Sequence, residues 1–390
     1  MKKLISLFLI FASICFVPAQ IIHGRILNDA GKTISGVNVY IDGTKIRTVS
    51  QEDGTFSLFL SAGTNGSLVF QKESYETLTS PAAAAVDKNL KVILLKTNNI
   101  EEVVLVPYTE EAYRNYIGYF LENFLGSDLQ NVKIKNQRSL KFAYDKKNRT
   151  LQVKSPKTLI IENKNLGYEI EYNLLGFSAD FDSRMVNYTG TSVFKETKST
   201  PKVKLNRLNA YDGSMLHFLR SIYRNTVAED TFIVNHVVKV PNPKYPTQEE
   251  LKILKDFAQA SMMKGKEFII PENIRDISRR KSNEKPHALA IVKTQIPDSA
   301  YIQRNRQEVL LTFKDMLQVN YKKYYYELDG KEFVKTKVPV VLSSFLHPEG
   351  EIFEVSKDGN ISNPDLLITE GDFTKNKIEN MLPLDYQPGD

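Results

Sequence analysis

The chain of 390 residues has no tryptophan and a single cysteine, Cys15, which lies in an apolar N-terminal stretch. If that stretch is removed on export, the mature protein has no thiol, which excludes disulfides, thiol nucleophiles and thiolate metal sites. No later segment approaches the run of about 18 apolar residues that a transmembrane helix requires. The 52 basic residues exceed the 46 acidic ones by too little to indicate nucleic-acid binding.

Residues 1–19 have the pattern of a secretory signal peptide. Two lysines precede an apolar stretch over residues 4–17, which is too short to span a bilayer of about 30 Å. The small residue Ala19 stands before Gln20, so we expect cleavage between them. The alternatives are an uncleaved membrane anchor, or a lipoprotein anchored through Cys15, which lacks the small preceding residue of a lipobox.

Residues 20–97 are typical of a small β-sandwich. Alternating apolar residues are interrupted by turn dipeptides such as Asp42-Gly43 and Asp53-Gly54. About seven short strands at a spacing of roughly ten residues favour an all-β sandwich over a βαβ unit. The clearest strand-like runs lie at residues 21–27, 37–41, 45–49, 55–60, 68–70 and 90–95.

Three stretches of this region, residues 24–26, 31–39 and 53–56, resemble the carboxypeptidase-regulatory-like domain. That module also begins many TonB-dependent outer-membrane receptors. The resemblance implies a seven-stranded, transthyretin-like β-sandwich that accompanies enzymes without catalysing a reaction itself. In physical terms, Gly24 permits a close backbone approach and Phe56 fills the core from a facing strand.

No catalytic, metal-binding or cofactor-binding residues are predicted. A zinc peptidase needs clustered imidazoles and a carboxylate around an open position, typically with an H-E-x-x-H spacing. The histidines show no such spacing, so we do not expect a zinc peptidase despite the family name. They are His23, His217, His236, His287 and His347.

Residues 98–108 form a predicted linker, and residues 109–390 an α+β region. Segment 98–106 resembles the acidic and valine-rich run that leads into the energy-coupling box and plug of the receptors; the alternative is an edge strand leaving the sandwich. Thr109 is a plausible N-cap for a helix that ends at Gly126. Its aromatic stripe has the spacing of a buried helix face and consists of Tyr113, Tyr116, Phe120 and Phe124.

A strand-rich stretch over residues 132–198 follows this helix. Tyr168, Ile170 and Tyr172 alternate with polar residues at 169, 171 and 173, which predicts one buried and one solvated face.

The segment Tyr211–His217 brings Asp212, Ser214 and His217 close together in sequence and so suggests a nucleophile relay. A relay needs residues that converge from different elements, so a helix capped by Asp212 or Ser214 is the simpler interpretation. We expect that helix to run to Arg224 and to present a solvated, cationic face. The predicted interaction face comprises Tyr211, His217, Arg220 and Arg224.

A second basic stretch, residues 275–285, indicates a solvated loop or helix face. The alternative for this stretch is contact with anionic lipid head groups.

Four further segments resemble a group of exported gram-negative proteins that pair the regulatory-like domain with an uncharacterised C-terminal region. They are residues 159–168, 211–214, 358–364 and 381–386. The resemblance implies a location in the periplasm or at the outer membrane. We predict a non-enzymatic envelope binding or accessory protein without a cofactor, with the sandwich as its interaction module. Its expected partner is an envelope protein or a glycan and not a nucleic acid.

Two alternatives remain open from the sequence. One is an envelope hydrolase that acts on glycans or peptides through carboxylates of the C-terminal region. The other is an accessory role in TonB-dependent transport.

Overall fold

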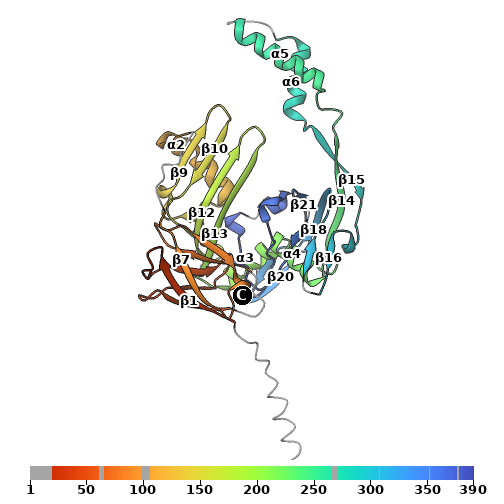
Figure 1. The fold of residues 1–390 in the computed structure, drawn as a ribbon. Helices are drawn as coiled ribbons and strands as arrows, with labels where there is room; N and C mark the ends of the chain where they lie inside the picture. The colour runs from red at the N-terminus through yellow and green to blue at the C-terminus, as the bar shows by residue number, and fades with distance from the viewer. Residues whose placement is uncertain are drawn as a thin grey trace, which may run out of the picture.

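The computed structural model describes residues 20–60, 66–97, 106–264, 270–306, 308–350, 352–375 and 377–390. The predicted signal peptide with Ala19, and segment 98–105 of the predicted linker, lie outside the described residues. The described elements are mainly strands, and most helices belong to the C-terminal part. They form three units: an N-terminal sandwich, a central sheet with a helix, and a C-terminal sheet (Figure 1).

The N-terminal unit is a sandwich of two sheets, as its turn pattern predicts. One sheet has the order β4-β1-β7 and the other the order β3-β2-β5-β6. Its elements are β1 (Gln20–Asn28), β2 (Asn38–Ile41), β3 (Arg47–Val49), β4 (Thr55–Leu60), β5 (Ser67–Gln71), β6 (Leu78–Pro81), η1 (Ala82–Ala84) and β7 (Asn89–Leu94).

Two residues singled out in the sequence have their predicted packing roles. Phe56 is 4% exposed and packs edge-on against Phe70, with ring centres 5.5 Å apart. A Cβ atom at Gly24 would lie 2.3 Å from the backbone oxygen of Leu90 on the neighbouring strand β7. Only glycine therefore allows β1 and β7 to pair this closely.

The central unit packs one helix against a six-stranded sheet. β12 pairs along its length with β13, and its two halves pair on the other side with β11 and β10. The elements are α2 (Glu110–Phe124), β8 (Val132–Ile134), η2 (Gln137–Ser139), β9 (Lys141–Asp145), β10 (Thr150–Lys154), β11 (Leu159–Asn163), β12 (Tyr168–Asp180) and β13 (Met185–Glu196).

Helix α2 begins and packs as the sequence predicts. The side-chain oxygen of Thr109 accepts a hydrogen bond of 3.1 Å from the Ala112 N–H, which is N-capping. Phe120 and Phe124 are fully buried against the sheet. The aromatic stripe is therefore a core face.

The C-terminal unit has a five-stranded sheet of order β15-β14-β18-β21-β23, with the small sheets β16-β17-β22 and β19-β20 beside it. The hairpin of β14 and β15 extends away from the body and has α5 and α6 at its tip (Figure 1). Helices of this part are α3 (Pro201–Tyr211), α4 (Met215–Arg224), α5 (Gln248–Lys264) and α6 (Glu272–Asn283).

The strands of the C-terminal unit are β14 (Phe232–Pro241), β15 (His287–Lys293), β16 (Ile302–Arg304), β17 (Val309–Leu311), β18 (Met316–Lys323), β19 (Tyr326–Asp329), β20 (Glu332–Lys335), β21 (Val340–Pro348), β22 (Phe353–Glu354) and β23 (Leu367–Gly371). Short 3-10 turns are η3 (Asp298–Ala300), η4 (Pro364–Leu366), η5 (Asp372–Lys375) and η6 (Ile378–Asn380). None of the helices in the described part of the chain is long and apolar enough to cross a membrane.

The basic stretch 275–285 lies mostly on α6, as a helix face. Ile274 and Ile277 are the buried residues of α6, and most of its cations are exposed. Arg280 is the exception, because it forms ion pairs with Glu250 of α5 and with Asp276. The solvated helix face is confirmed.

The sandwich docks on the outer face of the central sheet. The Tyr40 and Thr191 hydroxyls lie 2.8 Å apart, and the Asp42 carboxylate accepts a hydrogen bond of 2.7 Å from the Ser192 N–H. Arg47 forms an ion pair with Glu171, which belongs to the face of β12 that alternation predicts to be solvated. That prediction is wrong for this part of β12, because the alternation distinguishes the two faces without showing which neighbour covers each one.

The last residues of the chain connect all three units. Leu382 and Tyr386 are buried in the core of the central unit. The Leu384 N–H donates to the Gly43 oxygen of the sandwich at 2.7 Å. The Leu384 oxygen accepts from Arg220 of α4 at 2.9 Å. The C-terminal tail therefore belongs to the interior of the molecule.

Candidate functional site

A pocket of about 940 Å³ lies where the central unit, the C-terminal unit and the tail meet. Five parts of the chain line it: the turn after α2, the β11–β12 turn, α3 with the turn to α4, the ends of β18 and β21, and η5 with η6. Its volume is at the upper end of the roughly 300–1,000 Å³ that small-molecule sites occupy. Most of its lining residues are polar or charged.

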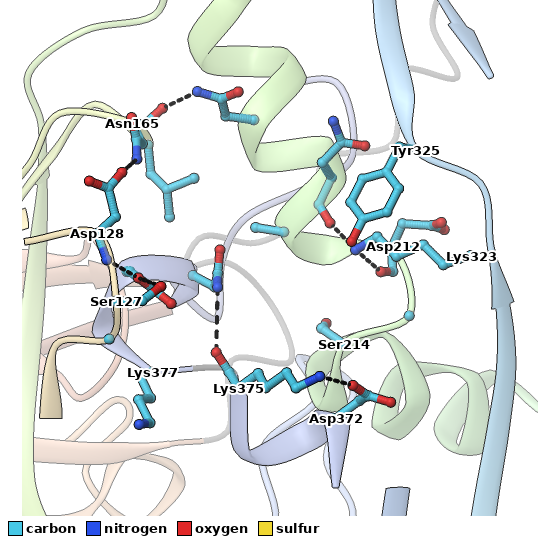
Figure 2. A pocket seen from close by; sticks show the side chains of 18 of the residues that line it. Ser127, Asp128, Asn165, Asp212, Ser214, Lys323, Tyr325, Asp372, Lys375 and Lys377 are labelled. Atoms are coloured by element: carbon cyan, nitrogen blue, oxygen red, sulfur yellow. Dashed lines mark hydrogen bonds and ion pairs between the residues drawn. The ribbon is translucent and has the colours of Figure 1, made fainter. Parts of the chain in front are cut away.

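Three residues of the pocket lining are joined by hydrogen bonds. The Asn165 side-chain N–H donates to the Asp128 carboxylate at 2.6 Å, and the Asn206 side-chain N–H donates to the Asn165 backbone oxygen at 2.9 Å. We call these three residues, Asp128, Asn165 and Asn206, the polar rail. Figure 2 shows Asp128 and Asn165 on the side of the pocket opposite Tyr325. The rail is held in place before any ligand arrives.

Glu379 supports the rail from the tail. Its carboxylate accepts a hydrogen bond of 2.8 Å from the Asp128 N–H. It lies directly against Gly126, where a Cβ atom would come within 2.1 Å of it and where φ is +119°. Gly126 is thus needed both for the end of α2 and for the position of Glu379.

Lys323 and Asp212 lie on the opposite side, beside α3. Lys323 is 8% exposed, and its ammonium group donates to the backbone oxygens of Asn209 and Asp212, so it caps the C-terminal end of α3. Burial lowers the pKa of Lys323, and the nearby Asp212 carboxylate opposes this effect. The Tyr321 hydroxyl donates to the Asp212 carboxylate at 2.7 Å. The hydrogen bond between Tyr321 and Asp212 links β18 to the α3–α4 turn.

Tyr325 provides an aromatic surface among the mostly polar residues that line the pocket. It is 43% exposed, and the Lys323 ammonium group lies 4.9 Å from its ring centre. Its position follows the end of β18, where the chain turns toward β19. The sequence shows only a run of three tyrosines there and does not indicate which ring lines a pocket.

Two pocket carboxyl groups have lowered pKa values. The side-chain amide of Asn131 and that of Asn165 hold the pKa of Asp128 below its ordinary value. Burial acts to raise the pKa of Asp372, but hydrogen bonds from Lys375 and from the Ser343 N–H outweigh it and lower that pKa. Both groups are therefore ionised at neutral pH and are not proton donors.

The segment 211–217 caps a helix and does not form a nucleophile relay. The Ser214 side chain accepts a hydrogen bond of 3.1 Å from the His217 N–H, as an N-cap of α4. His217 Nδ1 accepts from the Gly213 N–H at 3.2 Å, so its ring does not bond to the Ser214 hydroxyl. Burial lowers the pKa of His217, while the Asp212 and Asp230 carboxylates oppose this. The predicted capping role is confirmed.

The predicted interaction face 211–224 is not one exposed surface. Tyr211 is 5% exposed and Arg220 1% exposed, and the His217 ring packs at a tilt against Tyr211 with ring centres 4.8 Å apart. Arg224 is the exposed member of the four. The expectation of a solvated cationic face is therefore wrong for Arg220, because a loop and the tail supply backbone oxygens that bind its guanidinium group. The interaction role remains a prediction only for Arg224.

The five histidines lie apart in the structure. His236 pairs with Asp315 at 2.8 Å and His347 with Glu370 at 3.0 Å, while His23 and His287 are exposed. Within the described ranges there is no group of three or more His, Cys, Asp or Glu side chains that could hold a metal ion.

Sequence reasoning found one segment of the pocket and missed the others. Asp212, Gly213 and Ser214 belong to the motif that the sequence singles out, and all three line the pocket. Of the rail residues, Asp128 and Asn165 lie in turns and Asn206 lies on α3, and none of the three stands out as a functional residue by its type and spacing. A usable signal for Asn165 was its place in the segment 159–168, which resembles the exported proteins.

Comparison with known proteins concerns the N-terminal unit. Residues 22–105 match the model of the CarboxypepD_reg-like domain family. A TonB-dependent receptor from Formosa agariphila is 35% identical over 99 residues, which are 25% of this chain and 9% of the receptor. The chain thus matches less than a tenth of that relative's length. The N-terminal unit contains a CarboxypepD_reg-like domain, as its glycine and turn pattern predicts.

Proposed function

We propose that this protein is an exported binding protein of the cell envelope, and that the pocket between its central and C-terminal units holds the ligand. The single observation behind the binding role is a preorganised polar pocket of about 940 Å³ lined by both units and the tail. The regulatory-like domain and its likeness to part of a TonB-dependent receptor support a place in the envelope. No enzymatic step is needed to account for these features.

The pocket chemistry favours binding over hydrolysis. A carboxylate hydrolase needs one carboxyl group that stays protonated at neutral pH and donates its proton to the leaving group. The pKa values of Asp128 and Asp372 are shifted downward, which is the opposite direction. Among the residues that the structure describes, the carboxyl groups with raised pKa values are Asp42, Asp358 and Asp385, and none of these three lines the pocket.

The sandwich acts in this proposal as a docking module through its outward sheet. Its β3-β2-β5-β6 sheet faces the central unit, where Val69 and Tyr40 pack against Val193. The β4-β1-β7 sheet exposes apolar side chains, with Phe59 65% and Ile93 49% exposed. A partner in the envelope would bind on this sheet, since the other is already covered.

The binding role can be tested by native mass spectrometry of the full mature protein purified from the envelope of producing cells. We expect a small bound species in the wild type, and its loss in Asn206→Trp, which fills the pocket. Lys322→Trp is the control, because Lys322 is exposed on β18 and does not line the pocket. Equal occupancy in both variants, or no bound species in the wild type, would contradict the proposal.

Export is tested separately. The first described residue, Gln20, already belongs to strand β1 and pairs with Leu60 of β4, so removal of residues 1–19 leaves the described sandwich complete. We expect the envelope form to begin at Gln20, as measured by intact-protein mass and N-terminal peptide mapping. Replacing Ala19 by Gln should block cleavage and retain the longer form. A mature protein that still contains residues 1–19 would refute cleavage at this position.

A further inference from the structure

The free hydrogen-bonding capacity of the pocket indicates the class of its ligand. In the polar rail, the side-chain oxygens of Asn165 and Asn206 accept no hydrogen bond from any described residue. Ser214 accepts from the His217 N–H through its oxygen, so its O–H can still donate. A ligand that both donates and accepts hydrogen bonds at several points matches this set, and hydroxyl groups do both.

Tyr325 adds an aromatic surface on which a sugar ring can pack. Tyr325 is 43% exposed and lines a pocket whose other lining residues are mostly polar or charged (Figure 2). The C–H groups on one face of a sugar ring pack well on an aromatic ring, while the hydroxyl groups at its edge remain free for polar side chains. Asp128 and Asn165 of the rail lie on the side of the pocket opposite Tyr325, so one ligand can meet both.

The same features do not fit a peptide. Peptides bind mainly by adding a strand to a sheet edge, by placing a helix in an apolar groove, or through aromatic-lined proline sites. The pocket wall consists of turns, strand ends and one side of α3, and its few aliphatic residues are Leu129, Leu166, Ala210 and Leu342. It therefore offers neither a strand edge nor a continuous apolar groove.

We infer that the pocket binds an oligosaccharide, with its hydroxyl groups on the polar rail and one sugar ring on Tyr325. This inference rests on the proposed function, because it names the ligand class of the same site. The volume of about 940 Å³ leaves room for more than one sugar unit.

The test is isothermal titration of the full mature protein with oligosaccharides from disaccharide to hexasaccharide. The probes are the cello-, xylo-, manno-, malto- and chito-oligosaccharide series and oligogalacturonides, with tripeptides and tetrapeptides as the competing class. We expect binding of at least one oligosaccharide series. Tyr325→Ala should weaken it by about tenfold or more, whereas Tyr325→Phe should retain it within about threefold, because the ring is kept. Asn206→Ala should also weaken binding.

Leu328→Ala is the matched control, since Leu328 is 42% exposed on the adjacent strand β19 and does not line the pocket. The inference is overturned if no oligosaccharide binds, or if binding is as strong in Tyr325→Ala and Asn206→Ala as in Leu328→Ala. It is also overturned if only peptides bind. In that case Asn206→Trp still removes the bound species in native mass spectrometry, and the proposed binding function stands.

Discussion

Arg220→Ala is expected to lower the free energy of unfolding by about 3–5 kcal/mol. Arg220 is 1% exposed and donates to the backbone oxygens of Asp358 at 3.0 Å and Leu384 at 2.9 Å. Its loss leaves both oxygens without this partner and opens a cavity beside Tyr211. The measurement is urea unfolding followed by circular dichroism, because the chain has no tryptophan.

Arg224→Ala is the control for this prediction. Arg224 lies one helical turn further along α4 and is exposed, so its removal should change stability by no more than about 0.5 kcal/mol. Arg220→Met keeps much of the side-chain volume but not the hydrogen bonds. Its loss of unfolding free energy should therefore lie between those of Arg220→Ala and Arg224→Ala. If Arg220→Ala proves as mild as Arg224→Ala, the tail does not hold the C-terminal unit in the way described.

Asp42→Asn is expected to stabilise the protein at neutral pH and to have little effect in acid. Burial at the junction with the central sheet raises the pKa of Asp42 from 3.8 to about 6. The folded state thus binds the Asp42 proton more tightly than the unfolded state does. The protonated Asp42 carboxyl group therefore contributes to the stability of the wild type. This contribution is fully present below about pH 4 and is lost as the pH rises through 6. The shift corresponds to at most about 3 kcal/mol.

The pH dependence of the difference between Asp42→Asn and wild type checks this prediction. Unfolding should be measured from pH 4 to pH 8, and the advantage of the variant should grow across this range. The asparagine oxygen can still accept the Ser192 N–H, so the docking geometry is kept. Asp53→Asn is the control of opposite sign, because the Thr55 hydroxyl and N–H lower the pKa of the fully exposed Asp53. A difference that does not vary with pH would exclude the buried carboxyl group as its cause.

Several local features were predictable from the sequence because their causes are local. The sandwich follows from alternating apolar residues separated by turn glycines, and Gly24 and Phe56 occupy the packing positions that this pattern indicates. Helix α2 follows from the Thr109 cap and the aromatic spacing, and α4 from the Ser214 cap. These signals span a few residues each, so neighbours in sequence are enough to produce them.

Arg220 and Glu171 show where local patterns fail. Helical spacing placed Arg220 on the polar face of α4, and strand alternation placed Glu171 on the solvated face of β12. Both assignments are correct in one respect: each residue lies on the face of its element that points away from the nearest apolar core. Neither can show that Arg220 meets the tail or that Glu171 meets Arg47 of the sandwich, because those partners lie more than a hundred residues away.

The sequence by itself determined the sandwich, the family of its domain, and the helices with clear caps. Only the tertiary structure decided that the C-terminal tail returns into the core of the central unit, and that turns from residues 126 to 380 meet around one pocket. The physical reason is that periodicity and capping describe contacts within a few residues, whereas the pocket depends on which long-range pairings bury the most apolar surface together.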